Sequence, residues 1–407
     1  MADRERASSP FYPDQIVPPQ FFVGRKSQIE RLTRRGIQQT AAGKPTFFFL
    51  SGEYGIGKSS LADYVQRVAV ERHGLQPVSV RLGGVRTVKE FCERLVRACF
   101  DASSGDPRVV DRLKRGFPKL FREVSLFGVK LNLDALRAEV PEVDSPKSAL
   151  AFLQGYLKQL GSEAKGVLIV LDELNGIASN ADFAAFLKTM VDDNAQLNPP
   201  VPLMLLLCGT PERRREFVKA YPSVDRIFDV VTVEKMSDEE SEEFFRGTFE
   251  SAEIEVDPYT DLASDLSAMN LLVISSEGLP KVMQMLGNNV FFMDSDGFVD
   301  MDDVGRAYDE TVEEFGAKFV DDQIVKAIQS PDCRAILSKL TGFVNSEFTR
   351  DQLAAKLEPS EAAKLTAFLK RMRDLNVLRS TDKKGGYAFN IDMVATYISM
   401  SARLDRS

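Results

Sequence analysis

The sequence of 407 residues has a single histidine, His73, and only four cysteines. One histidine argues against metal sites built from several histidines and against Ser-His-Asp catalysis. Any chemistry therefore depends on carboxylates, lysines, arginines and hydroxyl groups. The cysteines at 92, 99, 208 and 333 form no CxxC pair, and three of them lie in strongly apolar patterns. This arrangement indicates buried thiols in a reducing compartment.

Long hydrophobic runs are also missing. No apolar run reaches the roughly 18 to 20 residues that a bilayer-spanning helix needs. The first fifteen residues, MADRERASSPFYPDQ, are charged and contain prolines, so they lack the apolar core of a signal peptide. We expect a cytoplasmic protein without membrane contact.

The chain has a net charge of -8 with 44% hydrophobic and 28% charged residues, as a soluble globular protein does. Its length predicts two or three domains. The acidic balance argues against a protein that coats nucleic acid with its whole surface. From 331 to 407, however, thirteen Lys and Arg face nine Asp and Glu, so this end is about +4 and the remainder about -12.

The region from 21 to 235 predicts an α/β fold. Four apolar runs of strand length, TFFFLSG, QPVSVRL, GVLIVLDE and VPLMLLLCGT, alternate with amphipathic helical patterns. Their continuous apolarity indicates burial on both faces, which is typical of a parallel sheet between helices. Residues 1–20 read as a flexible arm because four prolines interrupt it, and 119–134 read as an inserted hairpin of no evident purpose.

Helical patterns dominate after this region. Ser237 and Glu240 form a predicted capping box, which opens a helical domain over 236–325. Within it, DSDGFVD at 294–300 resembles a calcium loop but has no glutamate at the twelfth position, so we expect a turn leading into a helix. Residues 326–407 contain three helical patterns and two strand-like runs joined through Lys383 and Lys384, the order of a winged helix.

One stretch, LSGEYGIGKSS at 50–60, predicts a phosphate site. It matches GxxxxGK[ST] between a buried strand and the helix pattern SSLADYVQRVAV. The glycines let backbone N–H groups converge on phosphate oxygens, Lys58 supplies positive charge, and the Ser59 hydroxyl reaches Mg²⁺. The alternative is a glycine-rich turn without a ligand. The expected phosphate-binding residues are Gly52, Glu53, Tyr54, Gly55, Ile56, Gly57, Lys58, Ser59 and Ser60.

Two further strands end in polar residues that complete this site. Asp172 and Glu173 follow the run VLIVL, at the edge where open parallel sheets bind ligands. Asp172 is expected to hold Mg²⁺ and Glu173 to polarise the attacking water, unless both acids cap a following helix. Thr210, at the end of PLMLLLCGT, is expected to contact the γ-phosphate or that water.

Together these motifs resemble the AAA+ and related STAND P-loop ATPases, above all the origin-recognition and replication-initiator ATPases and the bacterial and archaeal ATPases similar to them. The resemblance spans most of residues 20–407. It implies that FFVGRKSQIERL places Val23, Gly24 and Arg25 beside adenine. It also implies an arginine finger, Arg226, and a lid residue near the γ-phosphate, Lys281, which lacks the forked geometry of the more usual arginine.

The resemblance leaves several uses of ATP open. The first is an ATP-hydrolysing switch that assembles as a homo-oligomer and engages double-stranded DNA. The second is a signalling or defence ATPase whose winged helix contacts protein, a possibility favoured by the acids Glu361 and Asp374. The third is a nucleotide-binding protein that hardly turns over. In the first case the DNA contacts would be Lys364, Lys370, Arg371, Arg373, Lys383 and Lys384.

Overall fold

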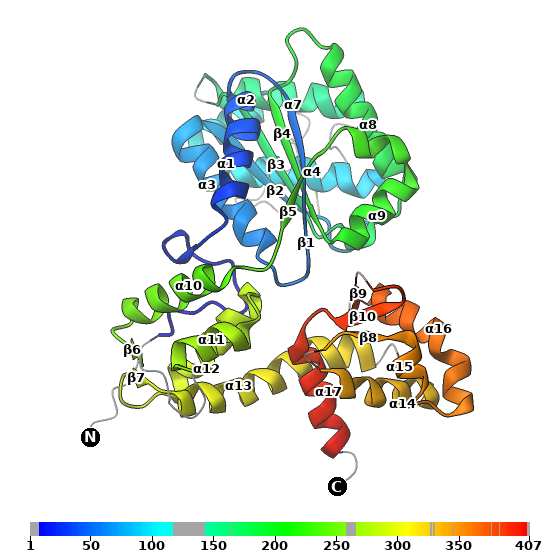
Figure 1. Cartoon of the computed structure of the whole chain (residues 1–407). Helices are drawn as coiled ribbons and strands as arrows, with labels where there is room; N and C mark the ends of the chain where they lie inside the picture. Colours follow the sequence, from blue (N-terminus) through cyan, green and yellow to red (C-terminus); the bar gives the residue numbers. More distant parts are fainter. Residues whose placement is uncertain are drawn as a thin grey trace, which may run out of the picture. The chain divides into compact units, whose positions relative to one another are not determined.

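The chain folds into two compact units (Figure 1). The computed structural model describes residues 8–404, apart from 117–142, 163, 258–265, 326, 327, 329, 345, 376 and 382. The first unit is Ile16–Glu234, and the second combines the described residues of Met1–Gln15 with those of Lys235–Ser407. The hairpin expected at 119–134 lies outside the described residues.

A five-stranded parallel sheet forms the centre of the first unit, with the strand order β2-β3-β4-β1-β5. The predicted α/β class is therefore confirmed, and each of the four apolar runs corresponds to one strand. The fifth strand was not predicted, because its apolar pattern is short and is interrupted by Thr232. The strands are β1 (Thr46–Gly52), β2 (Leu75–Arg81), β3 (Gly166–Asp172), β4 (Leu203–Gly209) and β5 (Asp229–Val233).

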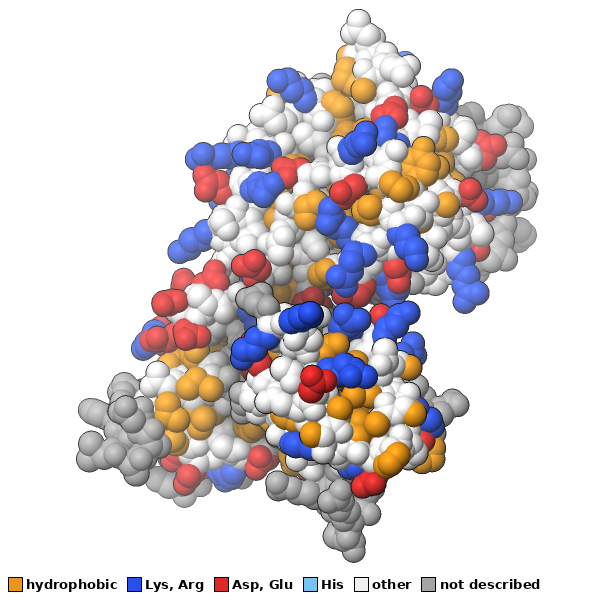
Figure 2. All heavy atoms as spheres, turned by 45° about the vertical axis from the view of Figure 1, so that its right-hand side comes forward, with side chains coloured by type: hydrophobic (Ala, Val, Ile, Leu, Met, Phe, Trp, Pro, Cys, Tyr) orange, Lys and Arg blue, Asp and Glu red, His pale blue; other side chains and the backbone are white. Residues whose placement is uncertain are grey.

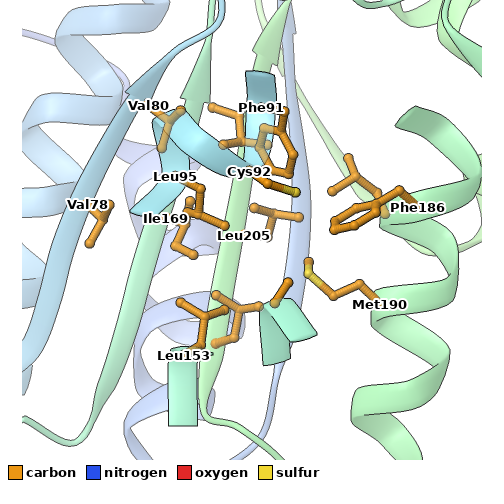
Figure 3. Close-up of a cluster of buried hydrophobic side chains, with 14 of the residues drawn as sticks. Val78, Val80, Phe91, Cys92, Leu95, Leu153, Ile169, Phe186, Met190 and Leu205 are labelled. Atoms are coloured by element: carbon orange, nitrogen blue, oxygen red, sulfur yellow. The ribbon is translucent and has the colours of Figure 1, made fainter. Parts of the chain in front are cut away.

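Both faces of this sheet are buried. In β3, Ile169 packs into a cluster with side chains of α4, α7 and α8 (Figure 3), while its neighbours Leu168 and Val170 are buried on the opposite face, where α3 lies. Burial on both sides explains the continuous apolar runs. The helices of this unit are α1 (Lys26–Arg31), α2 (Gln38–Ala41), α3 (Lys58–His73), α4 (Val88–Ser103), α5 (Pro107–Gly116), α7 (Pro146–Leu160), α8 (Ala181–Gln196) and α9 (Pro211–Ala220).

Helices make up most of the second unit. The predicted capping box is present at its start: Ser237 Oγ accepts a hydrogen bond from Glu240 N at 3.2 Å, and the Glu240 carboxylate accepts one from Ser237 N at 3.1 Å. Two very short parallel strands, β6 (Glu255–Val256) and β7 (Phe298–Val299), were not expected there. The helices are α10 (Asp238–Ser251), α11 (Ala268–Ser276), α12 (Pro280–Met293) and α13 (Met301–Phe315).

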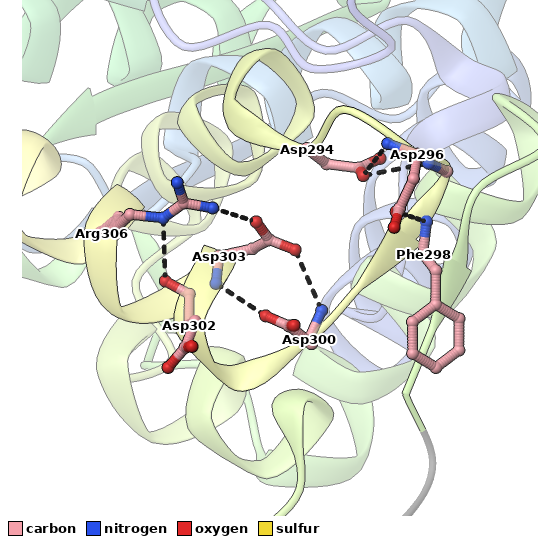
Figure 4. A network of polar contacts seen from close by, with 8 residues as sticks. Asp294, Asp296, Phe298, Asp300, Asp302, Asp303 and Arg306 are labelled. Atoms are coloured by element: carbon pink, nitrogen blue, oxygen red, sulfur yellow. Dashed lines mark hydrogen bonds and ion pairs between the residues drawn. The ribbon is translucent and has the colours of Figure 1, made fainter. Parts of the chain in front are cut away.

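The acidic stretch after α12 is a turn leading into a helix, as the sequence predicts (Figure 4). Asp294 Oδ1 accepts hydrogen bonds from Asp296 N and Gly297 N, both at 3.0 Å, and Asp300 caps α13 by accepting one from Asp303 N at 2.9 Å. These carboxylates are thus used to hold the backbone. Among the described residues, no group of three or more His, Cys, Asp or Glu is arranged to hold a metal ion.

Residues 8–15, which belong to the expected arm 1–20, are grouped with the second unit and pack within it. Phe11 is buried, with its ring edge-on to Phe244 and Phe249 at centroid distances of 6.0 and 5.0 Å. Tyr12 N donates a hydrogen bond to Gln284 Oε1 at 2.6 Å. The prolines of this segment prevent a helix, but an extended segment can still dock through an aromatic side chain.

The C-terminal region contains a three-stranded sheet in the order β8-β10-β9, with antiparallel pairing. Its helices and strands follow the predicted order, but β8 and α17 were not foreseen. None of the described helices combines the length and apolarity that a membrane-spanning helix requires. The elements are α14 (Pro331–Leu340), β8 (Phe348–Thr349), α15 (Arg350–Ala354), α16 (Pro359–Asp374), β9 (Leu378–Ser380), β10 (Gly386–Phe389) and α17 (Asp392–Leu404).

Candidate nucleotide-phosphate site

The glycine-rich loop lies between β1 and α3 in the first unit. Gly55 and Gly57 have φ angles of 73° and 90°, which favour glycine because other residues reach this region only at a cost. Gly57 is the N-cap of α3 and brings no side chain to cap it. The N–H groups of the first helical turn are therefore directed to the space beside the loop, where an anion is favoured by the helix dipole.

Lys58 folds back over this loop. Its Nζ donates hydrogen bonds to the carbonyl oxygens of Gly52 at 2.9 Å and Glu53 at 2.7 Å. Burial lowers the pKa of Lys58, and the charges of Asp172 and Glu53 act in the opposite direction. A bound phosphate would add to that opposing effect, because it stabilises the charged amine.

Ser59 and Asp172 meet at the end of β3. The Ser59 hydroxyl donates to Asp172 Oδ2 at 2.7 Å, and Asp172 Oδ1 accepts from Glu173 N at 2.8 Å. Magnesium prefers oxygen ligands and commonly uses one or two protein groups together with substrate phosphates. A hydroxyl and a carboxylate in contact beside a phosphate loop fit that requirement, so these residues fit Mg²⁺.

Glu173 has a backbone conformation that differs from those of its neighbours. Its φ angle is 63°, in the left-handed region, and its side chain is exposed. It precedes the 3₁₀ turn Leu174–Gly176 but makes no side-chain hydrogen bond to cap it. Asn180 caps the following helix, α8, by accepting from Phe183 N at 2.9 Å. The alternative in which Glu173 caps a helix is therefore not realised here.

Thr210 directly follows β4, which lies between β1 and β3 in the sheet. Its Oγ1 accepts a hydrogen bond from Arg213 N at 3.4 Å and so caps α9. As a hydroxyl group it keeps one hydrogen to donate. Thr210 thus lies at the same edge of the sheet as Asp172.

Arg25 is held beneath the phosphate loop. Gly24 and Arg25 both have positive φ angles, 74° and 61°, and Arg25 is only 6% exposed. Its guanidinium donates to the carbonyl oxygen of Ile56 at 3.1 Å and to that of Glu234. The resemblance placed Val23, Gly24 and Arg25 beside adenine. It did not indicate that Arg25 links the phosphate loop to Glu234, the last residue of the first unit.

The two residues assigned to nucleotide sensing have different environments. Arg226 ends the 3₁₀ helix Pro222–Arg226 and is exposed, and within the described residues it makes no ion pair. Lys281 belongs to the second unit, where its Nζ contacts the Pro13 carbonyl oxygen, Asp14 Oδ1 at 2.8 Å, and the Phe319 ring at 5.5 Å from the centroid.

The basic residues expected to contact DNA fall into two groups. Lys364 pairs with Asp332, and Lys383 pairs with Glu347 at 3.1 Å. The others are exposed and form no ion pair with the described residues; they are Lys370, Arg371, Arg373 and Lys384. Basic side chains are prominent on the face of the second unit seen in Figure 2.

The site and sheet together define a P-loop NTPase. The segment 22–206 matches the model of the AAA ATPase domain family. It contains the phosphate loop, Asp172 and Glu173, whereas Thr210 and Arg226 follow it. No curated protein matches the chain.

Two archaeal proteins share the fold over nearly the whole chain. A Walker-type ATPase of Pyrococcus abyssi has a TM-score of 0.58 at 19% identity, covering 93% of this chain and 99% of its own. The ORC2 protein of Aeropyrum pernix, in ADPNP–ADP complexes, has a TM-score of 0.58 at 14% identity, covering 99% of both chains. Both likenesses are of fold, and they cover the C-terminal region as well as residues 22–206.

Proposed function

We propose that the chain binds and hydrolyses ATP, and that nucleotide binding controls its assembly. The contact between Ser59 and Asp172 beside the glycine-rich loop carries this proposal. It brings a hydroxyl and a carboxylate to the N-terminus of α3, and a nucleoside triphosphate with its metal ion needs both. The nucleotide complexes of the A. pernix ORC2 protein give a precedent for adenine nucleotides on this fold.

In the proposed reaction Lys58 exchanges its contacts with Gly52 and Glu53 for phosphate oxygens. Glu173 orients and polarises the attacking water, and Thr210 donates its remaining hydrogen to the γ-phosphate or to that water. Ser59 and Asp172 would hold Mg²⁺, which neutralises developing charge when bound. Catalysis of phosphoryl transfer depends chiefly on such positioning and electrostatic stabilisation.

Assembly is proposed to depend on Arg226. Its guanidinium is exposed and unpaired among the described residues, so it can reach the nucleotide of a neighbouring subunit without breaking an ion pair. An arginine finger contributes about 10³ to 10⁵ in rate. Lys281 is the proposed lid residue near the γ-phosphate, and it would have to leave its contacts with Pro13 and Asp14 to act there.

We further propose that residues 326–407 form a winged helix that engages double-stranded DNA. The exposed cations Lys370, Arg371 and Arg373 on α16, with Lys384 between β9 and β10, would contact phosphates. A second function has one observation in its favour. Lys364 and Lys383 are paired with acids, which lowers the charge available to DNA and suits a winged helix that contacts protein.

Size analysis of the purified chain with and without ATP, each with and without duplex DNA, tests the proposal. We expect ATP to produce a larger species and DNA to join it. The Glu173→Gln variant should accumulate that ATP-bound species because the water is no longer polarised. Absence of adenine nucleotide binding would refute the whole proposal, whereas ATP-dependent assembly without DNA binding would favour the protein-binding alternative.

A further inference from the structure

The Glu173 side chain extends over a glycine of the neighbouring loop. The loop at 82–87 joins β2 to α4, and a Cβ atom added to Gly83 would lie 2.4 Å from Glu173 Oε2. Its next neighbours in Glu173 would be Cδ at 3.6 Å and Cβ at 4.0 Å. The space above Gly83 is thus taken by the tip of Glu173, and any larger residue at 83 would displace that carboxylate.

The loop itself is held too firmly to move aside. Leu82 N donates to Asp172 O at 2.7 Å, which joins it to the residue next to Glu173. Arg94 Nη1 donates to the carbonyl oxygens of Arg81 at 2.7 Å and Gly83 at 2.9 Å. On the far side, Asn180 Nδ2 donates to Arg86 O at 2.9 Å.

The turn after Glu173 leaves equally little room. A Cβ atom on Gly176 would lie 2.5 Å from Val85 O, so the backbone of that turn and that of the β2–α4 loop are already in close contact. The two backbones thus leave each other little room, and hydrogen bonds hold the β2–α4 loop. The terminal carboxylate of Glu173 is the part that can give way, because it lies at the end of a flexible side chain.

From this geometry we propose that Gly83 is a positioning residue for hydrolysis: its missing side chain lets the Glu173 carboxylate occupy the place from which it polarises water. The inference rests on the proposed function, since the role of Gly83 depends on the proposed role of Glu173 in hydrolysis. It also gives a reason for the two adjacent glycines that follow β2. Gly84 makes the turn with a φ angle of 77°, and Gly83 leaves room for the Glu173 carboxylate.

The test is Gly83→Ala, measured by ATP affinity and by turnover. We expect turnover to fall at least about tenfold, because a displaced general base loses a contribution of about 10² to 10⁴. ATP affinity should stay within about twofold, since the phosphate loop is untouched. Gly105→Ala is the matched control: a Cβ atom there meets nothing within 4 Å, so turnover should not change.

A double-mutant cycle separates positioning from general damage. Adding Gly83→Ala to Glu173→Gln should lower turnover no further, because the side chain that the new methyl group displaces no longer acts as a base. Additive losses would overturn the inference, as would wild-type turnover in Gly83→Ala. If Glu173→Gln alone keeps wild-type turnover, the proposed role of Glu173 fails instead.

A second variant applies if Gly83→Ala does not fold. Arg94→Ala removes the two hydrogen bonds that hold the loop and leaves Gly83 in place. We expect this variant to lower turnover while keeping ATP affinity, with the loss again absent in the Glu173→Gln background. Unchanged turnover in Arg94→Ala would then overturn the inference.

Discussion

The Ser59 hydroxyl donates a hydrogen bond to Asp172 Oδ2 at 2.7 Å. The two residues come from α3 and from the end of β3, and β4 separates β3 from the strand that leads into α3. Their contact therefore exists only because the parallel strands end at a common edge. This edge is where the nucleotide-phosphate site forms.

Ser59→Ala is expected to remove the magnesium-dependent part of ATP affinity. Without its hydroxyl the site keeps the Asp172 carboxylate but loses an oxygen ligand. The factor by which Mg²⁺ raises ATP affinity should therefore be at least about ten times smaller in the variant than in the wild type. Titration calorimetry with and without Mg²⁺ measures the difference. Ser79→Ala, which removes a hydroxyl from β2, is the control, and equal magnesium dependence in both variants would contradict the assignment.

Burial lowers the pKa of Lys58 from the ordinary lysine value of 10.5. As the pH rises, ATP affinity is therefore expected to begin to decline at a pH lower than 10.5. ATP affinity falls with rising pH because phosphate binds the protonated amine of Lys58 more strongly than the neutral amine. Once the pH exceeds the pKa of Lys58 in the nucleotide-free protein, ATP binding must take up a proton. Dissociation constants measured between about pH 7 and 10 test this. Lys58→Arg should give a flat profile because arginine stays charged, and the idea fails if both profiles coincide.

Arg226→Ala is expected to abolish the dependence of ATPase activity on protein concentration. The wild-type rate per subunit should rise with concentration as neighbouring subunits supply the arginine, whereas the variant should stay slow throughout. Activity assays across a concentration series measure this. Arg214→Ala, which removes the ion-pair partner of Asp225, is the control at the same surface. A variant rate equal to wild type at every concentration would rule out a finger acting between subunits.

Replacement of exposed cations on the C-terminal region is expected to weaken DNA binding and its salt dependence. Each phosphate contact contributes a slope of about -0.9 in log affinity against log salt, so Lys370→Ala and Lys384→Ala should each reduce the slope by about one. Fluorescence anisotropy at several salt concentrations measures it. The control is Lys158→Ala, an exposed lysine of α7. A salt slope near zero in the wild type would favour a protein partner.

Phe11→Ala is expected to destabilise the second unit by about 3 to 5 kcal/mol, the usual cost of deleting a buried phenylalanine side chain. Phe11 is 4% exposed and packs between Phe244 and Phe249, whereas Phe292 is 64% exposed. Phe292→Ala is therefore the control, with an expected change near zero. Denaturant unfolding of both variants measures the difference, and equal midpoints would show that the Phe11 side chain does not stabilise this unit.

The sequence determined the α/β class and the phosphate loop, because buried parallel strands and phosphate binding both leave local patterns. Continuous apolar runs such as 47–50 mark strands covered on two faces, and the spacing from Gly52 to Ser59 is a local requirement of phosphate binding. The capping box at Ser237 is likewise local. Short elements such as β5 and β8 escaped prediction because their apolar pattern is too brief.

Only the tertiary structure decided which distant residues meet. Nothing near Gly83 in the chain indicates that a carboxylate ninety residues away lies above it, and no local pattern tells that Phe11 docks between two rings of α10. Both contacts arise because packing brings together elements that lie far apart in the sequence. Glycine and phenylalanine are common in turns and terminal segments, so their presence alone does not indicate these contacts. The pairing of Lys364 with Asp332 is of the same kind: the sequence supplies the charges, and the packing of helices decides which of them remain exposed.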